Sequence, residues 1–146
     1  MIALLQRVRE ARVEVRGRVA GAIGPGLLML VCAEPADGAP QALRLVDKVL
    51  KLRIFSDDAG RMNRSLLDVG GELLVVSQFT LAADCSGGNR PSFGGAAPAD
   101  QGRALYEEVL RLVRERLGAV QCGEFAADMQ VHLVNDGPVT IPLTLR

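Results

Sequence analysis

The sequence predicts a single α/β domain over residues 1–146, with a mixed, largely antiparallel β-sheet, a barrel-like core and two helices, layered α/β/β. Strand-like segments follow one another at the start of the chain, which favours antiparallel pairing. Two continuous apolar runs are typical of strands covered on both faces. Two further stretches carry apolar residues at helical spacing. A chain of 146 residues is long enough to bury one hydrophobic core.

Extended chain is predicted at the start, where apolar and charged residues alternate. Residues 2–8 and 12–16 are expected to be strands, and residues 18–23 return as another strand after a tight turn at Gly17. The continuous apolar run over residues 27–33 is expected to be a buried strand.

The first helix is predicted over residues 39–51, with Asp37 as its N-cap and Pro40 in its first turn. Its apolar face repeats at helical spacing and comprises Leu43, Val46, Val49 and Leu50. Beyond it, residues 54–55 look extended and residues 56–60 are expected to form a turn.

A second buried strand is predicted over residues 73–76, and it runs into the polar segment Ser77-Gln78-Phe79-Thr80. Residues 82–98 are small, rich in glycine and interrupted by proline, so a long irregular connection of the functional or mobile kind is expected. The second helix is predicted over residues 99–117, with Gly118 at its C-cap.

The last part of the chain is predicted to be extended. Strands are expected over residues 119–125 and 128–135, followed by a sharp turn at Asn135-Asp136-Gly137-Pro138 and a final strand over residues 139–145.

Composition excludes several classes of function. Lys and Arg together number 17, as do Asp and Glu, and this zero net charge disfavours a protein that wraps long nucleic acid, so no DNA partner is expected. His132 is the only histidine, and no metal or nucleotide-binding motif occurs, so we expect no metal and no cofactor. Backbone amides, a hydroxyl group or the substrate itself then remain as catalytic tools, which suits hydrolysis of an activated ester.

The cysteines and the apolar runs bear on location. Cys32, Cys85 and Cys122 form no CxxC pair and imply no disulfide framework, which fits a reduced compartment. The start of the chain lacks a signal-peptide core, and no apolar run approaches the ~20 residues of a membrane span. We therefore expect a cytoplasmic protein without a membrane partner.

Two polar segments are candidates for a site. The segment from Ser77 to Thr80 follows a buried strand, where backbone N–H groups can point into a cleft and Thr80 supplies a hydroxyl. As a pattern alone, it is more typical of a strand end whose Ser and Thr bond to local backbone. In the second segment, Gly137 allows close backbone approach and the Gly137–Pro138 bond is a candidate for a cis peptide, although an ordinary turn is the simpler interpretation.

These segments closely resemble the D-aminoacyl-tRNA deacylase family. The strongest similarity lies in the runs Asp68 to Leu81, Asn89 to Phe93 and Leu133 to Thr140. It continues, in order and over essentially the whole chain, through Gln6-Arg7-Val8, Ile23 to Leu27, Leu52 to Phe55 and Met62-Asn63. The SQFT and NDGPVT segments are highly specific when they occur together.

The resemblance implies a homodimer that hydrolyses the ester bond of D-aminoacyl-tRNA, with two active sites at the subunit interface. Ser77, Gln78, Phe79 and Thr80 would line one side of each site, and Gly137-Pro138 would reach in from the partner subunit with a cis peptide. Phe125 and Met129 match positions near the bound terminal adenosine. Rejection of L side chains by the partner's backbone would leave glycyl-tRNA cleavable as well.

Three departures from the common family text concern the surroundings of this site. Ala82 stands where a tyrosine is frequent, and Cys85-Ser86-Gly87 replaces a stretch that is often basic, which puts tRNA contacts through this loop in doubt. Ala126 replaces a usual glycine beside Phe125, on the adenosine side of the expected pocket.

Two other functions fit parts of the sequence. A non-catalytic, homodimeric module that binds RNA ends would agree with the zero net charge and the weakened basic loop, but the presence of both specific segments argues against it. A related editing domain of different chirality is disfavoured by the SQFT text. Thr80 as a nucleophile and assistance by the ribose 2′-hydroxyl of the substrate both remain open as mechanisms.

Overall fold

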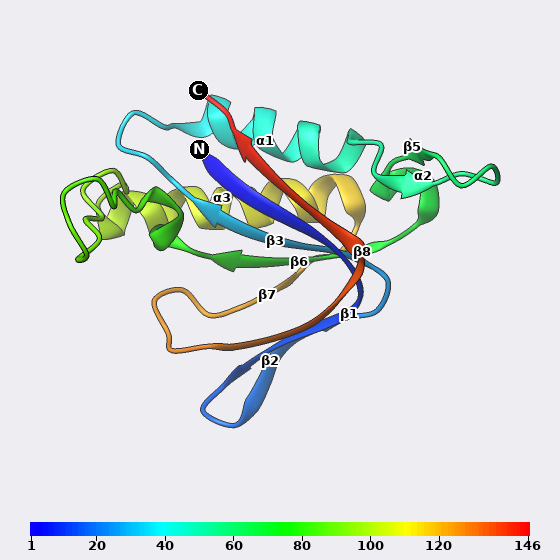
Figure 1. Ribbon diagram of the computed structural model, residues 1–146, viewed down its shortest axis with the longest axis horizontal. Coiled ribbons are helices and arrows are strands. Elements are labelled where there is room, and N and C mark those ends of the chain that lie inside the picture. The colour runs from blue at the N-terminus through cyan, green and yellow to red at the C-terminus, as the bar shows by residue number, and fades with distance from the viewer.

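The computed structural model describes residues 1–146 and shows a six-stranded mixed sheet with two long helices on one face (Figure 1). The sheet order is β2-β1-β3-β6-β7, and β8 pairs with the other edge of β1. The elements of this sheet are β1 (Ile2–Val15), β2 (Arg18–Ile23), β3 (Gly26–Cys32), β6 (Glu72–Ser77), β7 (Gln121–Cys122) and β8 (Gln130–Thr144).

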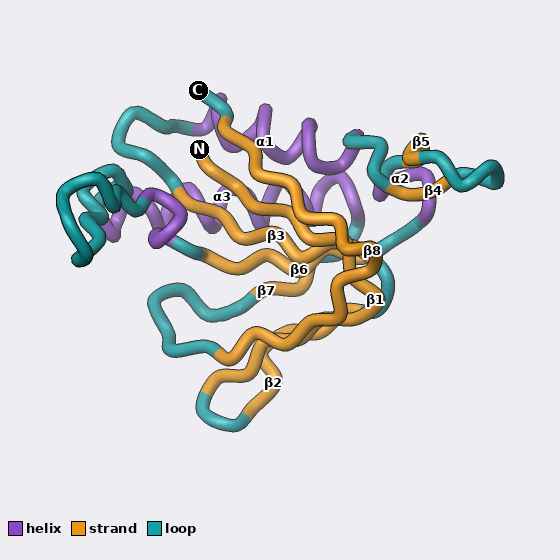
Figure 2. Tube along the Cα trace, in the orientation of Figure 1, coloured by secondary structure: helices purple, strands orange, loops and turns teal.

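Strand β1 organises the sheet because it pairs antiparallel with three others. Its first half pairs with β3, its second half pairs with β2, and β8 runs along its other edge. The pairs β3–β6 and β6–β7 are parallel. The tube in Figure 2 shows that the second half of β1 and the first half of β8, which pair with each other, curve away beneath β6 and β7. The predicted mixed, barrel-like sheet is therefore confirmed, with the two early strands merged into one.

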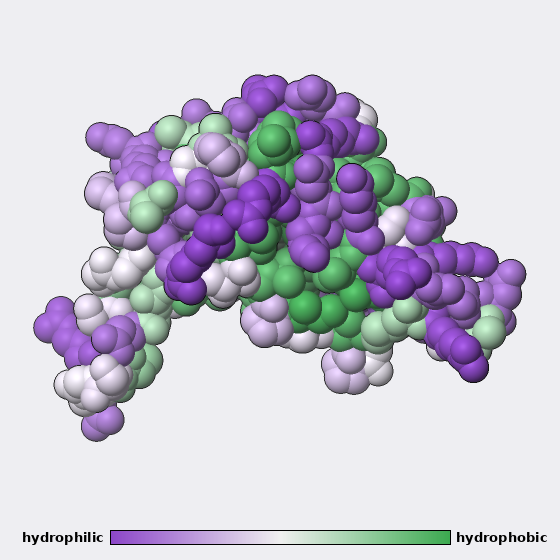
Figure 3. Space-filling model, turned by 90° about the horizontal axis from the view of Figure 1, so that it is seen from above, coloured by the Kyte–Doolittle hydropathy of each residue, from purple (hydrophilic) through white to green (hydrophobic).

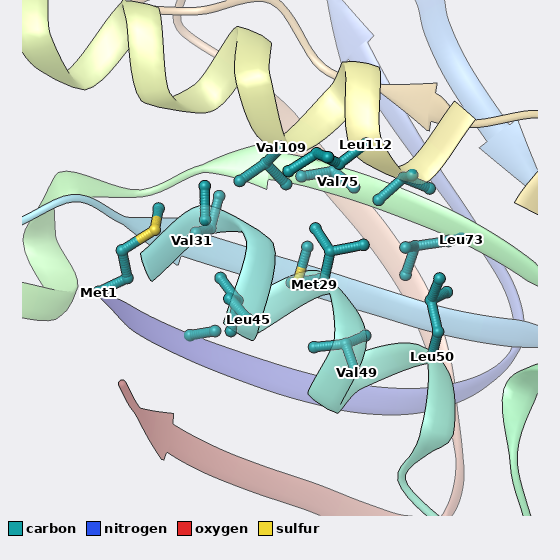
Figure 4. Packing of buried hydrophobic residues seen from close by; sticks show 14 of the residues in the cluster. Met1, Met29, Val31, Leu45, Val49, Leu50, Leu73, Val75, Val109 and Leu112 are labelled. Atoms are coloured by element: carbon teal, nitrogen blue, oxygen red, sulfur yellow. The ribbon is translucent and has the colours of Figure 1, made fainter. Parts of the chain in front are cut away.

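Two apolar clusters define the layers. The larger cluster lies between the helices and the sheet, and Figure 4 shows helix residues meeting strand residues there: Leu45, Val49, Val109 and Leu112 against Met29, Leu73 and Val75. The smaller cluster lies between the two halves of the curved sheet and includes Val8, Val13, Leu28, Leu74 and Val76. Adjacent residues such as Leu27 and Leu28 enter different clusters because side chains alternate along a strand. The predicted α/β/β layering is confirmed.

The helices match their predicted bounds. Helix α1 spans Ala39–Lys51 and α3 spans Ala99–Leu117, where Gly118 adopts φ +89° and donates its N–H to Arg114 O. The N-cap of α1 is Gly38, not Asp37, because the Asp37 carboxylate instead accepts the N–H of Glu34 at 2.7 Å. No helix of the chain is both long and apolar enough to cross a membrane.

Short elements were missed by the sequence patterns. A one-turn helix, α2 (Leu66–Val69), begins at Ser65, whose hydroxyl accepts the N–H of Asp68. A 3-10 turn, η1, covers Phe79–Ala82. Each element has too few residues to show a periodicity. By contrast, the extended residues 54–55 and the turn at residues 56–60 were predicted, and they belong to a small hairpin that joins β4 (Phe55–Ser56) to β5 (Met62–Arg64).

The predicted end of the chain is wrong in two places. Only Gln121–Cys122 of residues 119–125 is a strand, and the sharp turn at residues 135–138 does not occur. Strand β8 instead continues, because β1 pairs with it on both sides of this segment. Gln6 pairs with Thr140 and Val8 with Asn135, so four residues of β8 lie opposite Arg7 alone. The turn-forming residues make a bulge in a continuous strand.

Candidate active site

The segment after β6 leaves the sheet and turns at once into η1. The N–H of Gln78 donates to Val31 O at 2.8 Å, which continues the β3–β6 pairing by one residue. The Gln78 side chain then donates from Nε2 to the Thr80 hydroxyl at 2.6 Å. Ser77 is half-buried at the end of β6, whereas Thr80 is exposed. The four predicted residues thus stay together as one polar corner between sheet and loop.

Two backbone amides in this corner are available to a ligand. Within the turn, Leu81 N–H donates to Gln78 O at 3.2 Å and Ala83 N–H donates to Thr80 O at 3.1 Å. The amides of Phe79 and Thr80 come first in the turn, so no turn carbonyl lies behind them to accept their hydrogens. The Phe79 ring packs edge-on against Phe93, with 5.2 Å between centroids. This packing joins the turn to the long loop that carries Phe93.

A cavity of about 620 Å³ opens beside this corner. Its predicted members are Ser77, Gln78 and Phe79 from the end of β6, and Phe125 and Met129 from the β7–β8 connection. Its other walls are mainly apolar, with Phe93 on the long loop and Tyr106 on α3 among them. A largely apolar cavity with a few convergent polar groups is typical of a small-ligand site. Thr80 and the pair Gly137-Pro138 are not part of this lining.

Phe125 contacts two side chains of α3. The Arg103 guanidinium lies over the ring at 4.6 Å from its centroid, and the Tyr106 ring lies 5.8 Å away on a tilted plane. The next residue, Ala126, has φ +63°, a left-handed conformation that favours glycine. Alanine at this position therefore carries backbone strain that glycine would not.

Two titratable side chains in the cavity wall are kept neutral. Burial raises the pKa of Tyr106 well above its ordinary value, and its hydroxyl donates to Val75 O at 3.0 Å. Burial likewise raises the pKa of the Cys32 thiol, whose Sγ lies 3.6 Å from Phe79 O. Neither side chain is a ready nucleophile at neutral pH. No group of three or more His, Cys, Asp or Glu residues is arranged to hold a metal ion.

The segment Gly137-Pro138 forms the tip of the β8 bulge, and its peptide bond is cis. Gly137 adopts φ +152°, and a Cβ atom there would stand 2.7 Å from the backbone nitrogen of Val139. Below the tip, Arg7 donates from Nε to Asp136 O at 2.9 Å and from Nη1 to Ile54 O at 2.8 Å. The bulge is thus held by contacts that admit only glycine at position 137.

Within one folded chain, the bulge and the cavity lie at opposite ends of the sheet. In Figure 1 the bend of β8 lies at the right of the sheet, and the segment that follows β6 lies at the left. Figure 3 shows the surface from above, with hydrophobic atoms gathered between two projecting, mainly hydrophilic ends. One chain therefore brings Ser77, Gln78, Phe79, Phe125 and Met129 together and leaves Gly137-Pro138 apart.

Sequence reasoning missed several walls and supports of the site. Tyr106 and Phe93 belong to a helix and a loop whose patterns indicate only packing or irregular chain. Asn135, interpreted from the sequence as a turn residue, holds the bulge through its side chain. Arg7 lies in a segment that resembles the family, but no local sequence pattern predicts that its guanidinium donates to the carbonyls of both Asp136 and Ile54.

The chain matches one known family over nearly its whole length. The family model described as D-Tyr-tRNA(Tyr) deacylase matches residues 4–144. The D-aminoacyl-tRNA deacylase of Methylibium petroleiphilum is 71% identical over 145 residues, which cover 99% of this chain and 95% of the relative. The chain belongs to the D-aminoacyl-tRNA deacylase family. It is a hydrolase that acts on the ester bond of aminoacyl-tRNA, and D-aminoacyl-tRNA deacylase activity is the function of the family.

Further relatives and solved structures are similar to this deacylase over nearly its whole length. The D-aminoacyl-tRNA deacylase of Azoarcus sp. is 65% identical over 99% of this chain and 96% of its own length. A solved structure of a c-Myc DNA unwinding element binding protein superposes with a TM-score of 0.93 at 40% identity, covering 100% of this chain and 99% of that one. The structure of a probable eukaryotic D-amino acid tRNA deacylase gives a TM-score of 0.86 at 17% identity over 97% of each chain, and it shows the shared fold alone.

Proposed function

We propose that this deacylase hydrolyses D-aminoacyl-tRNA and glycyl-tRNA, and rejects L-aminoacyl-tRNA through Gly137-Pro138 of a partner subunit. One observation carries the proposal: the chain holds a complete apolar cavity beside free amides, while the rigid Gly137-Pro138 tip lies outside that cavity. A site that needs both parts requires a second copy of the chain, and a two-fold axis would complete two such sites at once.

The cavity suits the end of an aminoacyl-tRNA. The terminal adenosine would rest against Phe125 and Met129, whose ring and thioether offer apolar contact to a base. The ester would then reach the polar corner at Ser77 to Thr80. This placement uses the apolar wall for binding and the amides for chemistry.

Hydrolysis at this corner would be assisted by the substrate. The amides of Phe79 and Thr80 would bind the carbonyl oxygen, which becomes negative as water attacks the carbon. The ribose 2′-hydroxyl would orient that water. The bond between the carbonyl carbon and the 3′-oxygen then breaks, the water oxygen stays on the amino acid, and a water proton passes to the 3′-oxygen. No side chain in the lining is an evident general base, which supports this path over a Thr80 nucleophile.

Chirality would be sensed by exclusion. The partner's backbone at Gly137-Pro138 would occupy the side of the substrate Cα where an L side chain points. A D side chain points elsewhere, and glycine has none, so both would fit without a dedicated pocket. The hydrogen bonds of Arg7 and Asn135 to the bulge support this role, because a surface that excludes a side chain by steric clash must keep its position.

The exposed apolar surface supports a homodimer. Phe79 is 56% exposed at the corner, and Val134 is 47% exposed on β8 close to the bulge. Large apolar side chains left in water at both halves of the expected site are typical of a surface that another chain covers.

Mixed dimers test the composite site. Phe125→Ala removes an adenosine contact, and Gly137→Ala distorts the excluding tip; each variant alone is expected to lower D-tyrosyl-tRNA hydrolysis at least about tenfold. After co-refolding, half of the dimers carry one variant of each kind, and each has one intact site, so activity should recover to about one quarter of wild type. Activity of the mixture no higher than the average of the two pure variants would show that each chain supplies its whole site.

A further inference from the structure

Arg103 of α3 stands out among the cations around the cavity. Its guanidinium lies 4.6 Å from the centroid of the Phe125 ring, and Phe125 is a wall of the cavity. Its neighbour Gly102 also lines the cavity and places no side chain between the helix and the ring. Arg103 is exposed and is not itself part of the cavity lining, so its guanidinium lies beside the wall residue Phe125 and in reach of water.

The charge of Arg103 is not neutralised by the protein. Arg111, on the same helix, is held by Glu108 and Glu115 at 2.8 and 2.9 Å. Arg116 pairs with Asp47 of α1. Arg103 forms no ion pair and no hydrogen bond, although Asp100 and Glu107 lie one turn away on either side of it along α3. Its five N–H donors are therefore available to a ligand.

We propose that Arg103 binds a backbone phosphate of the tRNA 3′ end, next to the terminal adenosine. This rests on the proposed function, which places that adenosine against Phe125. A guanidinium stacked on a ring keeps its N–H groups in its own plane, and a planar fork matches two phosphate oxygens. The phosphodiester of the terminal nucleotide leaves the ribose at the 5′ carbon, away from the ester at the 3′ carbon. When the amides of Phe79 and Thr80 bind the ester within the cavity, the phosphate on the 5′ carbon is directed toward the outside of the cavity.

Arg103 would thus supply affinity without taking part in the chemistry. It gives a chain of zero net charge one local cation at the point where the substrate is anionic. Stacking on Phe125 restricts the long side chain before the tRNA arrives, which lowers the ordering cost of binding.

The test compares two substrates that differ in their phosphates. D-tyrosyl-tRNA carries the backbone phosphates, whereas 3′-O-D-tyrosyl-adenosine has the same ester and base but none. For Arg103→Gln we expect kcat/KM on the tRNA to fall about five- to tenfold, mainly through KM, because one charge-assisted contact is lost. Activity on the adenosine ester should stay within about twofold of wild type, and the salt dependence on tRNA should weaken by a log–log slope of about 0.7.

The controls separate binding from structure. Arg114→Gln removes another exposed arginine of α3 that forms no ion pair, about 16 Å further along the helix, and should leave both substrates unaffected. Arg103→Lys should recover part of the lost tRNA activity, since it keeps the charge but not the fork. Equal losses on both substrates would overturn the proposal, because Arg103 would then act by packing Phe125. Unchanged tRNA kinetics in Arg103→Gln would also overturn it. Failure of the wild-type protein to cleave D-tyrosyl-tRNA would instead sink the proposed function itself.

Discussion

The Asn135 side chain spans the bulge of β8 and binds both backbone groups of Val139. Its Oδ1 accepts the Val139 N–H at 2.7 Å, and its Nδ2 donates to Val139 O at 3.2 Å. The amide therefore takes the place of the strand β1, whose pairing with β8 is interrupted opposite Arg7. Hydrogen bonds from Asn135 and Arg7 thus hold the residues on either side of Gly137-Pro138 in the chain.

Removing the Asn135 amide should loosen this closed bulge. Asn135→Ala leaves the Val139 N–H without its acceptor, which should lower the free energy of unfolding by about 1–3 kcal/mol in urea titration. Asn135→Asp keeps the acceptor and loses the donor, so it should lose less. If the tip excludes L residues, the ratio of D- to L-tyrosyl-tRNA cleavage should fall in the same order. A ratio unchanged in Asn135→Ala would show that selectivity does not depend on the bulge.

A side chain at position 137 should not be tolerated. Gly137→Ala places a Cβ 2.7 Å from the Val139 nitrogen in a left-handed backbone, so a loss of about 1–3 kcal/mol of stability and at least about tenfold of activity is expected. Gly87→Ala is the matched control, because a Cβ there meets nothing within 4 Å. Its stability should stay within about 0.5 kcal/mol of wild type. Equal behaviour of the two variants in thermal unfolding and hydrolysis would contradict the geometry.

The fold was largely predictable because its signals are long. The run from Leu27 to Ala33 and the two periodic helices span enough residues to indicate their structures unambiguously. The prediction of a turn at residues 135–138 was wrong. Asn, Asp, Gly and Pro favour a turn in isolation, but here β1 pairs with the residues of β8 both before and after this segment, which keeps β8 one strand. That pairing joins residues more than 120 positions apart, which no local pattern records.

The candidate site was predictable in its residue types but not in its arrangement. Ser77, Gln78 and Phe79 line one cavity with Phe125 and Met129, while the catalytic and adenosine-binding roles of these residues stay predictions. Thr80 turns away from that lining, and its hydroxyl is occupied by Gln78. Side-chain direction at the corner is set by η1, a turn too short to be recognised in the sequence.

The Thr80 hydroxyl should be dispensable for the chemical step. It is exposed, lies outside the cavity lining and accepts a hydrogen bond from Gln78 Nε2. Under single-turnover conditions, Thr80→Ala should keep its hydrolysis rate within about tenfold of wild type, whereas loss of a true nucleophile costs on the order of 10⁴-fold or more. A nearly complete loss of the single-turnover rate, with an unchanged melting temperature, would establish Thr80 as the nucleophile.

The Cys32 thiol should be inert at neutral pH. Burial raises its pKa in the folded chain, so the neutral form is favoured; its contribution to stability is full below the unfolded-state pKa and is lost as pH rises through the folded-state pKa. Exposed Cys85 should be alkylated by iodoacetamide first, as read by peptide mass spectrometry. Cys32→Ala should keep its activity at pH 7 and lose less stability at alkaline pH. Alkylation of Cys32 at pH 7 as fast as that of Cys85 would falsify this.

The most direct measurement is hydrolysis of one tRNA charged in turn with D-tyrosine, L-tyrosine and glycine. At micromolar enzyme, exclusion by the Gly137-Pro138 tip predicts rapid release of D-tyrosine and glycine. It predicts L-tyrosine release at the uncatalysed rate. Cleavage of L-tyrosyl-tRNA as fast as D-tyrosyl-tRNA would contradict chiral exclusion, and no release of any of the three would contradict the proposed hydrolysis itself.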